Sequence, residues 1–207
     1  MWKRLSWLAV AGLWVSGCQL LISATPTPAM PAQPDSIPVT NDAGETLSTQ
    51  PGPLWVLVSG VDEHGLIAEH ELTLLARPDA AAVAETTIHT GTAVAVHEIR
   101  QTGPQSLRRF YRIQAPTGET GWISDFYVRR VAYLFNAEGT TVSLFAGPGE
   151  NELAKLANIT PVAVKSPLTD WWIVQTTDGN LTGWVQASYV KESPEPEFLL
   201  NQQHAHP

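Results

Sequence analysis

The chain has 207 residues and a formal charge of −8 at pH 7, from 12 basic and 20 acidic residues. Charged residues make up 15% of the sequence, whereas roughly 25% is usual for a soluble domain. A strongly negative chain is a poor nucleic-acid binder, because contacts to phosphates require clustered cations. The composition therefore argues against a nucleic-acid partner and suits an exported protein better than a cytosolic enzyme.

Residues 1–18 have the order of an export signal. Met1–Arg4 is a short basic region, Leu5–Val15 is apolar, and the letters VSGC follow at positions 15–18. This arrangement resembles the bacterial lipobox, in which an aliphatic residue and two small residues precede an invariant cysteine. The resemblance implies that the Cys18 sulfur receives a diacylglyceryl group before the chain is cut ahead of it, which gives a lipid anchor.

An uncleaved membrane helix is the alternative interpretation of this segment. The stretch from Leu5 to Ala24 contains no charged residue, and about 20 apolar residues suffice to cross a bilayer. Cys18 is the only cysteine in the chain, and a lone thiol at that position favours lipidation. Both interpretations place the remaining chain outside the cytoplasm, anchored to the cell membrane or an outer membrane, with no internal disulfide.

Two segments lack the pattern of a folded domain. Residues 19–53 are expected to form a linker, because Thr25 to Pro53 contains seven prolines and hardly any large apolar residue. Proline fixes the backbone and removes a hydrogen-bond donor, so an extended spacer is expected. Residues 193–207 are expected to form a disordered tail.

After Pro53 the sequence has the pattern of an all-β protein. Short runs rich in Val, Ile, Thr and aromatic residues alternate with Gly, Pro, Asp and Asn at intervals of about ten residues. The chain also repeats itself, and this divides it into residues 54–131 and 132–192. The matching segments are LTLLARP (72–78) with VSLFAGP (142–148), TAVAV (92–96) with TPVAV (160–164), and FYRIQAPTGETGWISDFYV (110–128) with WWIVQTTDGNLTGWVQASYV (171–190).

Each copy resembles the bacterial SH3-like domain, a small half-open barrel found in exported cell-envelope proteins. In the second copy the resemblance lies in Gly147, Pro148, Trp171, Trp172, Gly183, Trp184, Val185, Tyr189 and Val190. In the first it lies in Pro78, Phe110, Tyr111, Gly121, Trp122, Ile123, Tyr127 and Val128. The resemblance covers about two thirds of the chain and implies two tandem SH3-like barrels. Leu75 and Phe145 stand where the family usually has Arg, and Arg77 replaces a loop Gly, so a specific ligand is not carried over.

The sequence shows no catalytic arrangement. Cys18 is the only thiol, so a Cys-His peptidase is excluded. His-Glu pairs begin at His70 and His97, but a zinc peptidase helix needs a second His where this chain has Leu74 and Gln101. We therefore expect a protein that is not an enzyme and binds neither a metal nor a cofactor.

Two groups of side chains are candidates for ligand binding. Trp171 and its counterpart Phe110 lie on strands whose second face has no obvious cover, whereas Trp172 is expected in the core. The uncovered face either packs between the repeats or against Tyr133–Phe135, or it is an aromatic ligand surface.

The second group is basic. Arg109 and Arg112 lie near Arg108, Arg129 and Arg130 in the sequence. They form either a solvated face or a surface for an anionic partner. Taken together, the sequence predicts a membrane-anchored, non-enzymatic binding or adaptor lipoprotein that engages peptidoglycan or an envelope protein. A structural accessory subunit of a membrane complex is the alternative.

Overall fold

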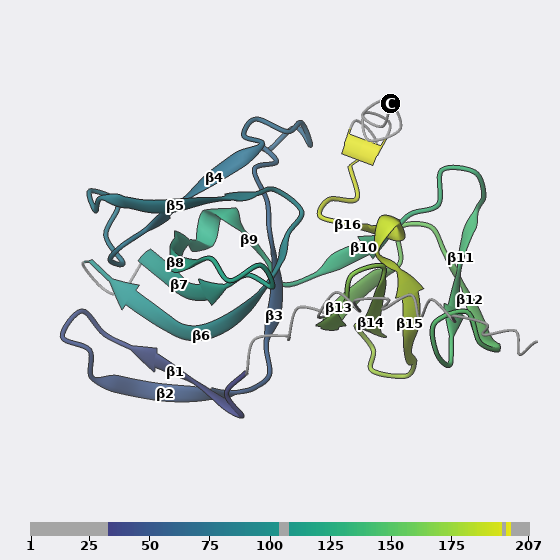
Figure 1. Cartoon of the computed structure of the whole chain (residues 1–207), viewed down its shortest axis with the longest axis horizontal. Helices are drawn as coiled ribbons and strands as arrows, with labels where there is room; N and C mark the ends of the chain where they lie inside the picture. Colours follow the sequence, from purple (N-terminus) through teal and green to yellow (C-terminus); the bar gives the residue numbers. More distant parts are fainter. Residues whose placement is uncertain (1–32, 104–107, 196–197, 200–207) are drawn as a thin grey trace, which may run out of the picture.

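The computed structural model describes residues 33–103, 108–195 and 198–199, so Cys18 and the expected export signal lie outside the described residues. The first sheet contains β1 (Ser36–Thr40), β2 (Thr46–Pro51), β3 (Trp55–Val58), β4 (Glu71–Leu75), β5 (Ala84–His89), β6 (Ala93–Thr102), β7 (Arg108–Gln114), β8 (Thr120–Ser124) and β9 (Val128–Arg129). The second contains β10 (Ala132–Leu134), β11 (Thr141–Phe145), β12 (Glu152–Ala157), β13 (Pro161–Pro167), β14 (Trp171–Thr176), β15 (Thr182–Gln186) and β16 (Val190–Lys191). The predicted all-β, SH3-like fold is confirmed (Figure 1).

The two sheets share one strand pattern, as the sequence repeat predicts. In the first sheet β6, β7, β8, β4 and β5 are successive neighbours, and in the second the order β13, β14, β15, β11 and β12 matches it. The registers agree in detail, since Leu75 of β4 pairs with Trp122 of β8 and Phe145 of β11 pairs with Trp184 of β15. A short 3-10 turn follows in each copy, η2 (Asp125–Tyr127) and η3 (Ala187–Tyr189).

The glycine before each of these tryptophans lets two strands approach closely. A Cβ atom on Gly121 would lie 2.8 Å from the Cβ of Leu74. On Gly183 it would lie 2.7 Å from the carbonyl oxygen of Phe145. Side chains do not fit at such distances, so glycine is required where β8 and β15 cross the neighbouring hairpin.

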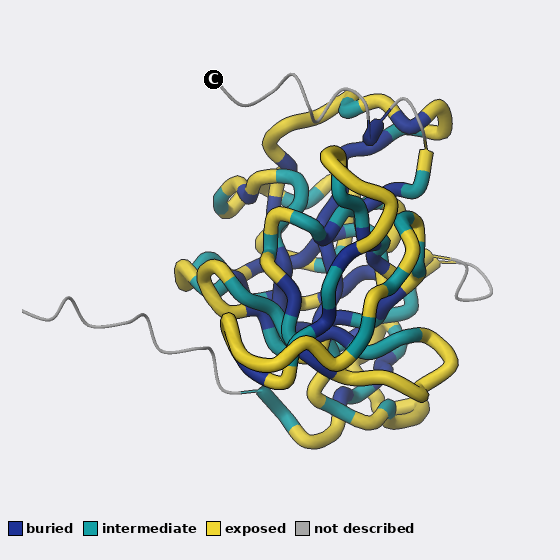
Figure 2. Tube along the Cα trace, turned by 90° about the vertical axis from the view of Figure 1, so that its right-hand side faces the viewer, coloured by how far each residue is buried: buried dark blue, intermediate teal, exposed yellow. Residues whose placement is uncertain are grey.

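Strand β3 joins the two repeats. Its four residues are all buried, and they alternate between two cores. Val56 and Val58 pack into the core of the first sheet, whereas Trp55 and Leu57 pack into the core of the second. An apolar run without alternation is the pattern of a strand buried on both faces. Strand β3 therefore contributes to both cores, and buried segments run through the middle of the molecule (Figure 2).

The expectation of a core-free linker over residues 19–53 is wrong for its second half. Strands β1 and β2 form a hairpin, and β1 pairs in parallel with β6 through Val39 and Ile99. Ile37 and Val39 are 0% and 4% exposed in the first core. The segment SIPVT alternates apolar and polar residues with period two, which is enough to bury one face of a short strand despite Pro38.

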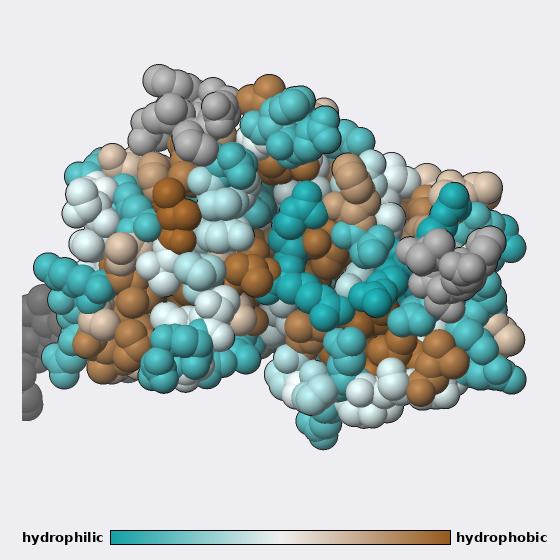
Figure 3. Space-filling view, turned by 180° about the vertical axis from the view of Figure 1, so that it is seen from behind, coloured by the Kyte–Doolittle hydropathy of each residue, from teal (hydrophilic) through white to brown (hydrophobic). Residues whose placement is uncertain are grey.

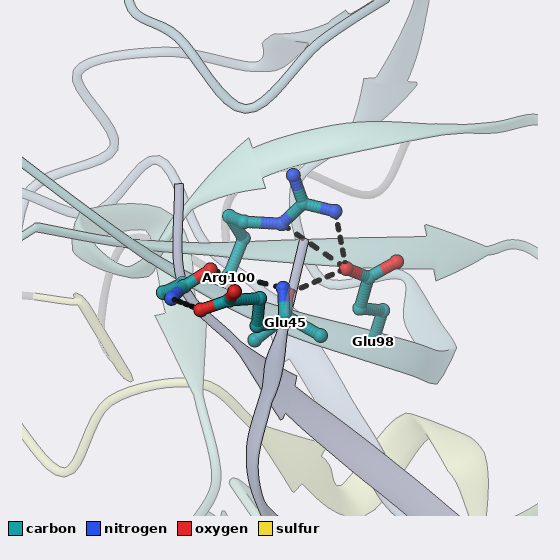
Figure 4. A network of polar contacts seen from close by, with 5 residues as sticks. Glu45, Glu98 and Arg100 are labelled. Atoms are coloured by element: carbon teal, nitrogen blue, oxygen red, sulfur yellow. Dashed lines mark hydrogen bonds and ion pairs between the residues drawn. The ribbon is translucent and has the colours of Figure 1, made fainter. Parts of the chain in front are cut away.

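A polar network fixes this hairpin on β6 (Figure 4). The Thr40 hydroxyl donates to Glu98 Oε1 at 2.7 Å, and the Arg100 guanidinium donates to the same oxygen at 2.6 Å. Arg100 also lies over the Trp122 ring, 5.4 Å from its centroid. At the turn of the hairpin, the Glu45 amide donates to the Asn41 side-chain oxygen. These contacts hold β1 and β2 as part of the first repeat.

The expectation of a disordered tail from residue 193 is also wrong where the tail is described. Ser193 is 7% exposed, and Phe198 and Leu199 are 1% and 3% exposed. The chain returns to the first repeat because these two apolar side chains pack against Val61. Glu192 lies at the start of this return, and burial raises the pKa of its carboxyl group.

Candidate functional site

The first repeat carries a cavity of about 540 Å³ that is open to solvent. We call it the Phe110 pocket and define it by the residues that line it: Glu69, Thr73, Leu75, Ala80, Arg108, Phe110, Ser124, Asp125 and Tyr127. Its volume lies within the usual range for small-ligand sites, roughly 300–1,000 Å³. The pocket therefore has room for part of a polymer or a short peptide.

The floor of the pocket is apolar and comes from paired strands. Phe110 is 4% exposed and pairs with Ser124 across β7 and β8. Thr73 and Leu75 lie two residues apart on β4, so both side chains point to the same face of the sheet. Strand β4 lies beside β8 through the pairing of Leu75 with Trp122. The fold thus brings three strands together around one buried phenyl ring.

The rim of the pocket is charged. Glu69 and Asp125 contribute carboxylates and Arg108 contributes a guanidinium group, and all three residues are exposed. The Tyr127 hydroxyl donates to Glu69 Oε1 at 3.0 Å. Burial, together with the hydrogen bond to Glu69 and its charge, raises the pKa of Tyr127.

Asp125 is positioned by the short turn in which it lies. It opens η2, and the Ser124 Oγ accepts a hydrogen bond from the Phe126 amide at 3.4 Å. The Asp125 side chain is left exposed at the edge of the pocket. The turn thus fixes the backbone at Asp125, and its exposed carboxylate can accept hydrogen bonds from a cationic group that enters from solvent.

The second repeat has rings at the equivalent position. Phe145 takes the place of Leu75, and Trp171 takes the place of Phe110. The Phe145 and Trp171 rings meet edge to face, with their centroids 5.5 Å apart and an interplanar angle of 86°. Ala187 stands where the first repeat has Asp125. The same location thus has a charged rim around one buried ring in the first repeat and two rings in contact in the second.

The predicted site residues are therefore separated by the fold. Phe110 forms the floor of the pocket, and Trp171 is half-buried against Phe145 in the other repeat. Arg109 is exposed but points away from Phe110, because neighbouring residues on a strand face opposite sides. Arg112 is exposed on the same face as Phe110 but does not line the pocket.

The five arginines that are close together in the sequence, Arg108, Arg109, Arg112, Arg129 and Arg130, do not form one basic face. Arg129 donates to the backbone carbonyls of Phe126 and Val61, at 2.7 and 3.4 Å. Arg130 donates to the Tyr111 hydroxyl at 2.8 Å. Both guanidinium groups thus make hydrogen bonds within the first repeat.

The apolar residues on the surface are also scattered. Seen from behind, they form separate patches among hydrophilic ones rather than one continuous surface (Figure 3).

Trp172 has the position expected of it. It packs against the core of the second repeat, next to the fully buried Val174, although it remains partly exposed. The two residues that the sequence interpretation missed are Glu69 and Asp125. For Glu69 a signal exists in the comparison of the repeats. This residue lies in an insertion, residues 66–70, where the second repeat has only Thr140.

In the part of the chain that the structure describes, no group of three His, Cys, Asp or Glu side chains is arranged to hold a metal ion. Within the same residues, no helix is both long and apolar enough to cross a membrane.

Solved structures with some similarity to this chain include two NlpC proteins and a domain of an endolysin. NlpC2 from Trichomonas vaginalis is 10% identical with a TM-score of 0.29, over 69% of this chain and 49% of that one. NlpC1 from the same organism is 9% identical with a TM-score of 0.28, over 70% and 48%. The CBD of endolysin LysPBC5 is 15% identical with a TM-score of 0.27, over 70% and 98%.

This chain spans about half the length of the two NlpC proteins. At these TM-scores the likeness carries no argument about function. No family model and no curated protein matches the chain.

Proposed function

We propose that this chain is a non-catalytic binding protein of the cell envelope, which binds peptidoglycan through the Phe110 pocket while a lipid on Cys18 anchors it to a membrane. The observation that supports the binding role most directly is the pocket itself, with an apolar floor and a charged rim. Its counterpart in the second repeat is occupied by the ring of Trp171. The pocket lies where the second repeat places the paired rings of Phe145 and Trp171, and this difference between two copies of one fold supports a ligand role for the first copy.

The charges on the rim indicate which part of peptidoglycan enters. The rim carries two carboxylates, on Glu69 and Asp125, and one guanidinium group, on Arg108. A polyanion would be repelled by such a rim, which argues against teichoic acids and acidic headgroups. The short peptides attached to the glycan strands of peptidoglycan carry free amino and carboxyl groups. An amino group near the two acids and a carboxylate near Arg108 would satisfy the rim, while methyl groups cover Phe110.

The binding role is tested by replacing Asp125 with asparagine. The side chain is exposed, so the fold and melting temperature should stay the same. Losing a charge-assisted hydrogen bond costs about 1.5 kcal/mol, so the affinity for purified peptidoglycan sacculi should fall about tenfold. The measurement is co-sedimentation with sacculi at several protein concentrations. Asp170→Asn, an exposed aspartate of the second repeat, is the matched control and should bind normally.

Two outcomes would contradict the proposed binding. If the protein were an accessory subunit that only packs against a partner, the unmodified protein would remain in the supernatant when the sacculi are pelleted. Equal binding by the Asp125→Asn variant and the unmodified protein would exclude the pocket rim as the ligand site.

The anchor is tested separately. Cys18→Ala removes the only thiol of the chain, so labelling with a fatty-acid analogue should be lost and unprocessed precursor should accumulate. Label retained on the Cys18→Ala protein would overturn the lipid anchor and leave the binding role untouched.

A further inference from the structure

Glu69, on the rim of the Phe110 pocket, is the last residue of a small hairpin, residues 60–69. Val61 and Ile67 form its single bridge. The amides of Ala68 and Glu69 both donate to the carbonyl oxygen of Gly60, at 2.9 and 3.2 Å. A Cβ atom on Gly60 would lie 2.0 Å from the Glu69 carbonyl oxygen, so the two ends of this hairpin touch. The position of the Glu69 carboxylate therefore depends on how the hairpin is held.

Hydrogen bonds hold the base and the tip of the hairpin: the Gly60 amide donates to the Thr90 hydroxyl, and the Asp62 carboxylate accepts from the amides of His64 and Leu66. Glu63, His64 and Leu66, around its tip, are exposed, and Leu66 is 43% exposed. An isolated two-stranded hairpin is only marginally stable in water. Apolar packing against the rest of the molecule must therefore add to these hydrogen bonds to keep the hairpin in place.

Residues from the other end of the chain provide that packing. Val61 and Ile67 share a small apolar cluster with Phe198 and Leu199 of the C-terminal segment and with Phe135, which follows β10 of the second repeat. Phe198 is 1% exposed and Leu199 is 3% exposed. The contact continues toward the tip, where a Cβ atom on Gly65 would lie 2.4 Å from the Cβ of Glu195.

We propose that Phe198 and Leu199 are positioning residues for the ligand site: by packing beneath the 60–69 hairpin they hold Glu69 at the pocket rim. This inference rests on the proposed function, because it assigns the C-terminal segment a part in peptidoglycan binding. It explains why a chain whose ligand pocket lies in the first repeat keeps a second repeat and a C-terminal return. Neither Phe198 nor Phe135 lines the pocket, so both act on the ligand only through the hairpin.

The test uses the full chain in detergent and the variant Phe198→Ala. Hydrogen–deuterium exchange should accelerate at least tenfold at the amides of Ala68 and Glu69, while protection of Ile113 in the first core stays unchanged. The phenol pKa of Tyr127, read from the ultraviolet titration difference between Tyr127 and Tyr127→Phe proteins, should fall toward its ordinary value as Glu69 moves away. Affinity for peptidoglycan sacculi should drop by about fivefold or more.

Two further variants keep the test decisive. Phe198→Leu retains an apolar side chain and should restore protection and binding, whereas Leu153→Ala, at a residue 54% exposed in the second repeat, should change neither. Should Phe198→Ala unfold the protein, Leu199→Ala removes less of the cluster and is measured instead. Unchanged exchange at Ala68 and Glu69 in a folded variant would overturn the positioning role. Faster exchange in a protein that never bound sacculi would leave the positioning of Glu69 standing and remove the proposed function instead.

Discussion

Replacing Trp55 with alanine should destabilise both repeats at once, by about 3–5 kcal/mol. Trp55 is 2% exposed and packs into the second core, although its strand, β3, pairs with β6 and β9 of the first sheet. The substitution leaves a cavity between the repeats, where Leu57, Ala93 and Ala95 also meet the second core. The measurement is chemical denaturation followed by tryptophan fluorescence and by far-ultraviolet circular dichroism.

A single unfolding transition that moves as a whole is the expected result, because β3 belongs to both cores. Leu153→Ala is the control on the surface of the second repeat and should change the free energy of unfolding by less than about 0.5 kcal/mol. If the Trp55→Ala protein instead unfolded in two steps, with only one of them shifted, the repeats would unfold independently. Strand β3 would then not couple their stabilities.

The repeat was predictable from the sequence because its signals are local. The Gly-Trp pairs at Gly121 and Gly183 lie at equivalent strand positions, and both copies have glycine there because the neighbouring strand leaves no room for a Cβ atom. Trp172 was also predictable as a core residue, since its period-two neighbour Val174 is fully buried. Alternation along one strand is enough to assign a side chain to a face.

The strand pair β1 and β2 escaped prediction because its partner is distant in sequence. Val39 pairs with Ile99, and no pattern within residues 36–51 reveals a parallel neighbour. The prolines of this region also suggested an extended spacer. The C-terminal segment was missed for a similar reason, because its apolar run, residues 198–200, is only three residues long. The burial of Phe198 and Leu199 depends on a cluster assembled from three parts of the chain.

The ligand site was predictable only in part. Phe110 stood out because it is a large aromatic residue on a strand face that the sequence left without a cover, and it does form the pocket floor. Asp125 could not be selected, because exposed acids in loops follow no period and most have no role beyond solubility. Glu69 is marked only by the insertion of residues 66–70, which appears when the two repeats are aligned. Arg109 and Arg112 were grouped with Arg108 by sequence distance, but alternation along β7 directs Arg109 to the opposite face.

The pocket can be closed by giving the first repeat the side chains of the second. The double substitution Leu75→Phe with Phe110→Trp copies Phe145 and Trp171, whose rings fit edge to face at 5.5 Å in the equivalent barrel. Overpacking costs about 1–3 kcal/mol in a filled core, but here the new atoms enter an open cavity of about 540 Å³, so the melting temperature should change little. Binding to peptidoglycan sacculi should fall at least about 30-fold, the equivalent of about 2 kcal/mol, because the apolar floor is no longer accessible.

The reverse exchange in the second repeat, Phe145→Leu with Trp171→Phe, is the matched control. It changes the same two positions of the same fold but leaves the Phe110 pocket intact, so affinity for sacculi should stay within about twofold of the unmodified protein. This pair of variants also separates the two aromatic positions that the sequence could not rank. If the filled first repeat still bound sacculi and the altered second repeat did not, the ligand surface would be that of Trp171, and the hollow over Phe110 would have no part in recognition.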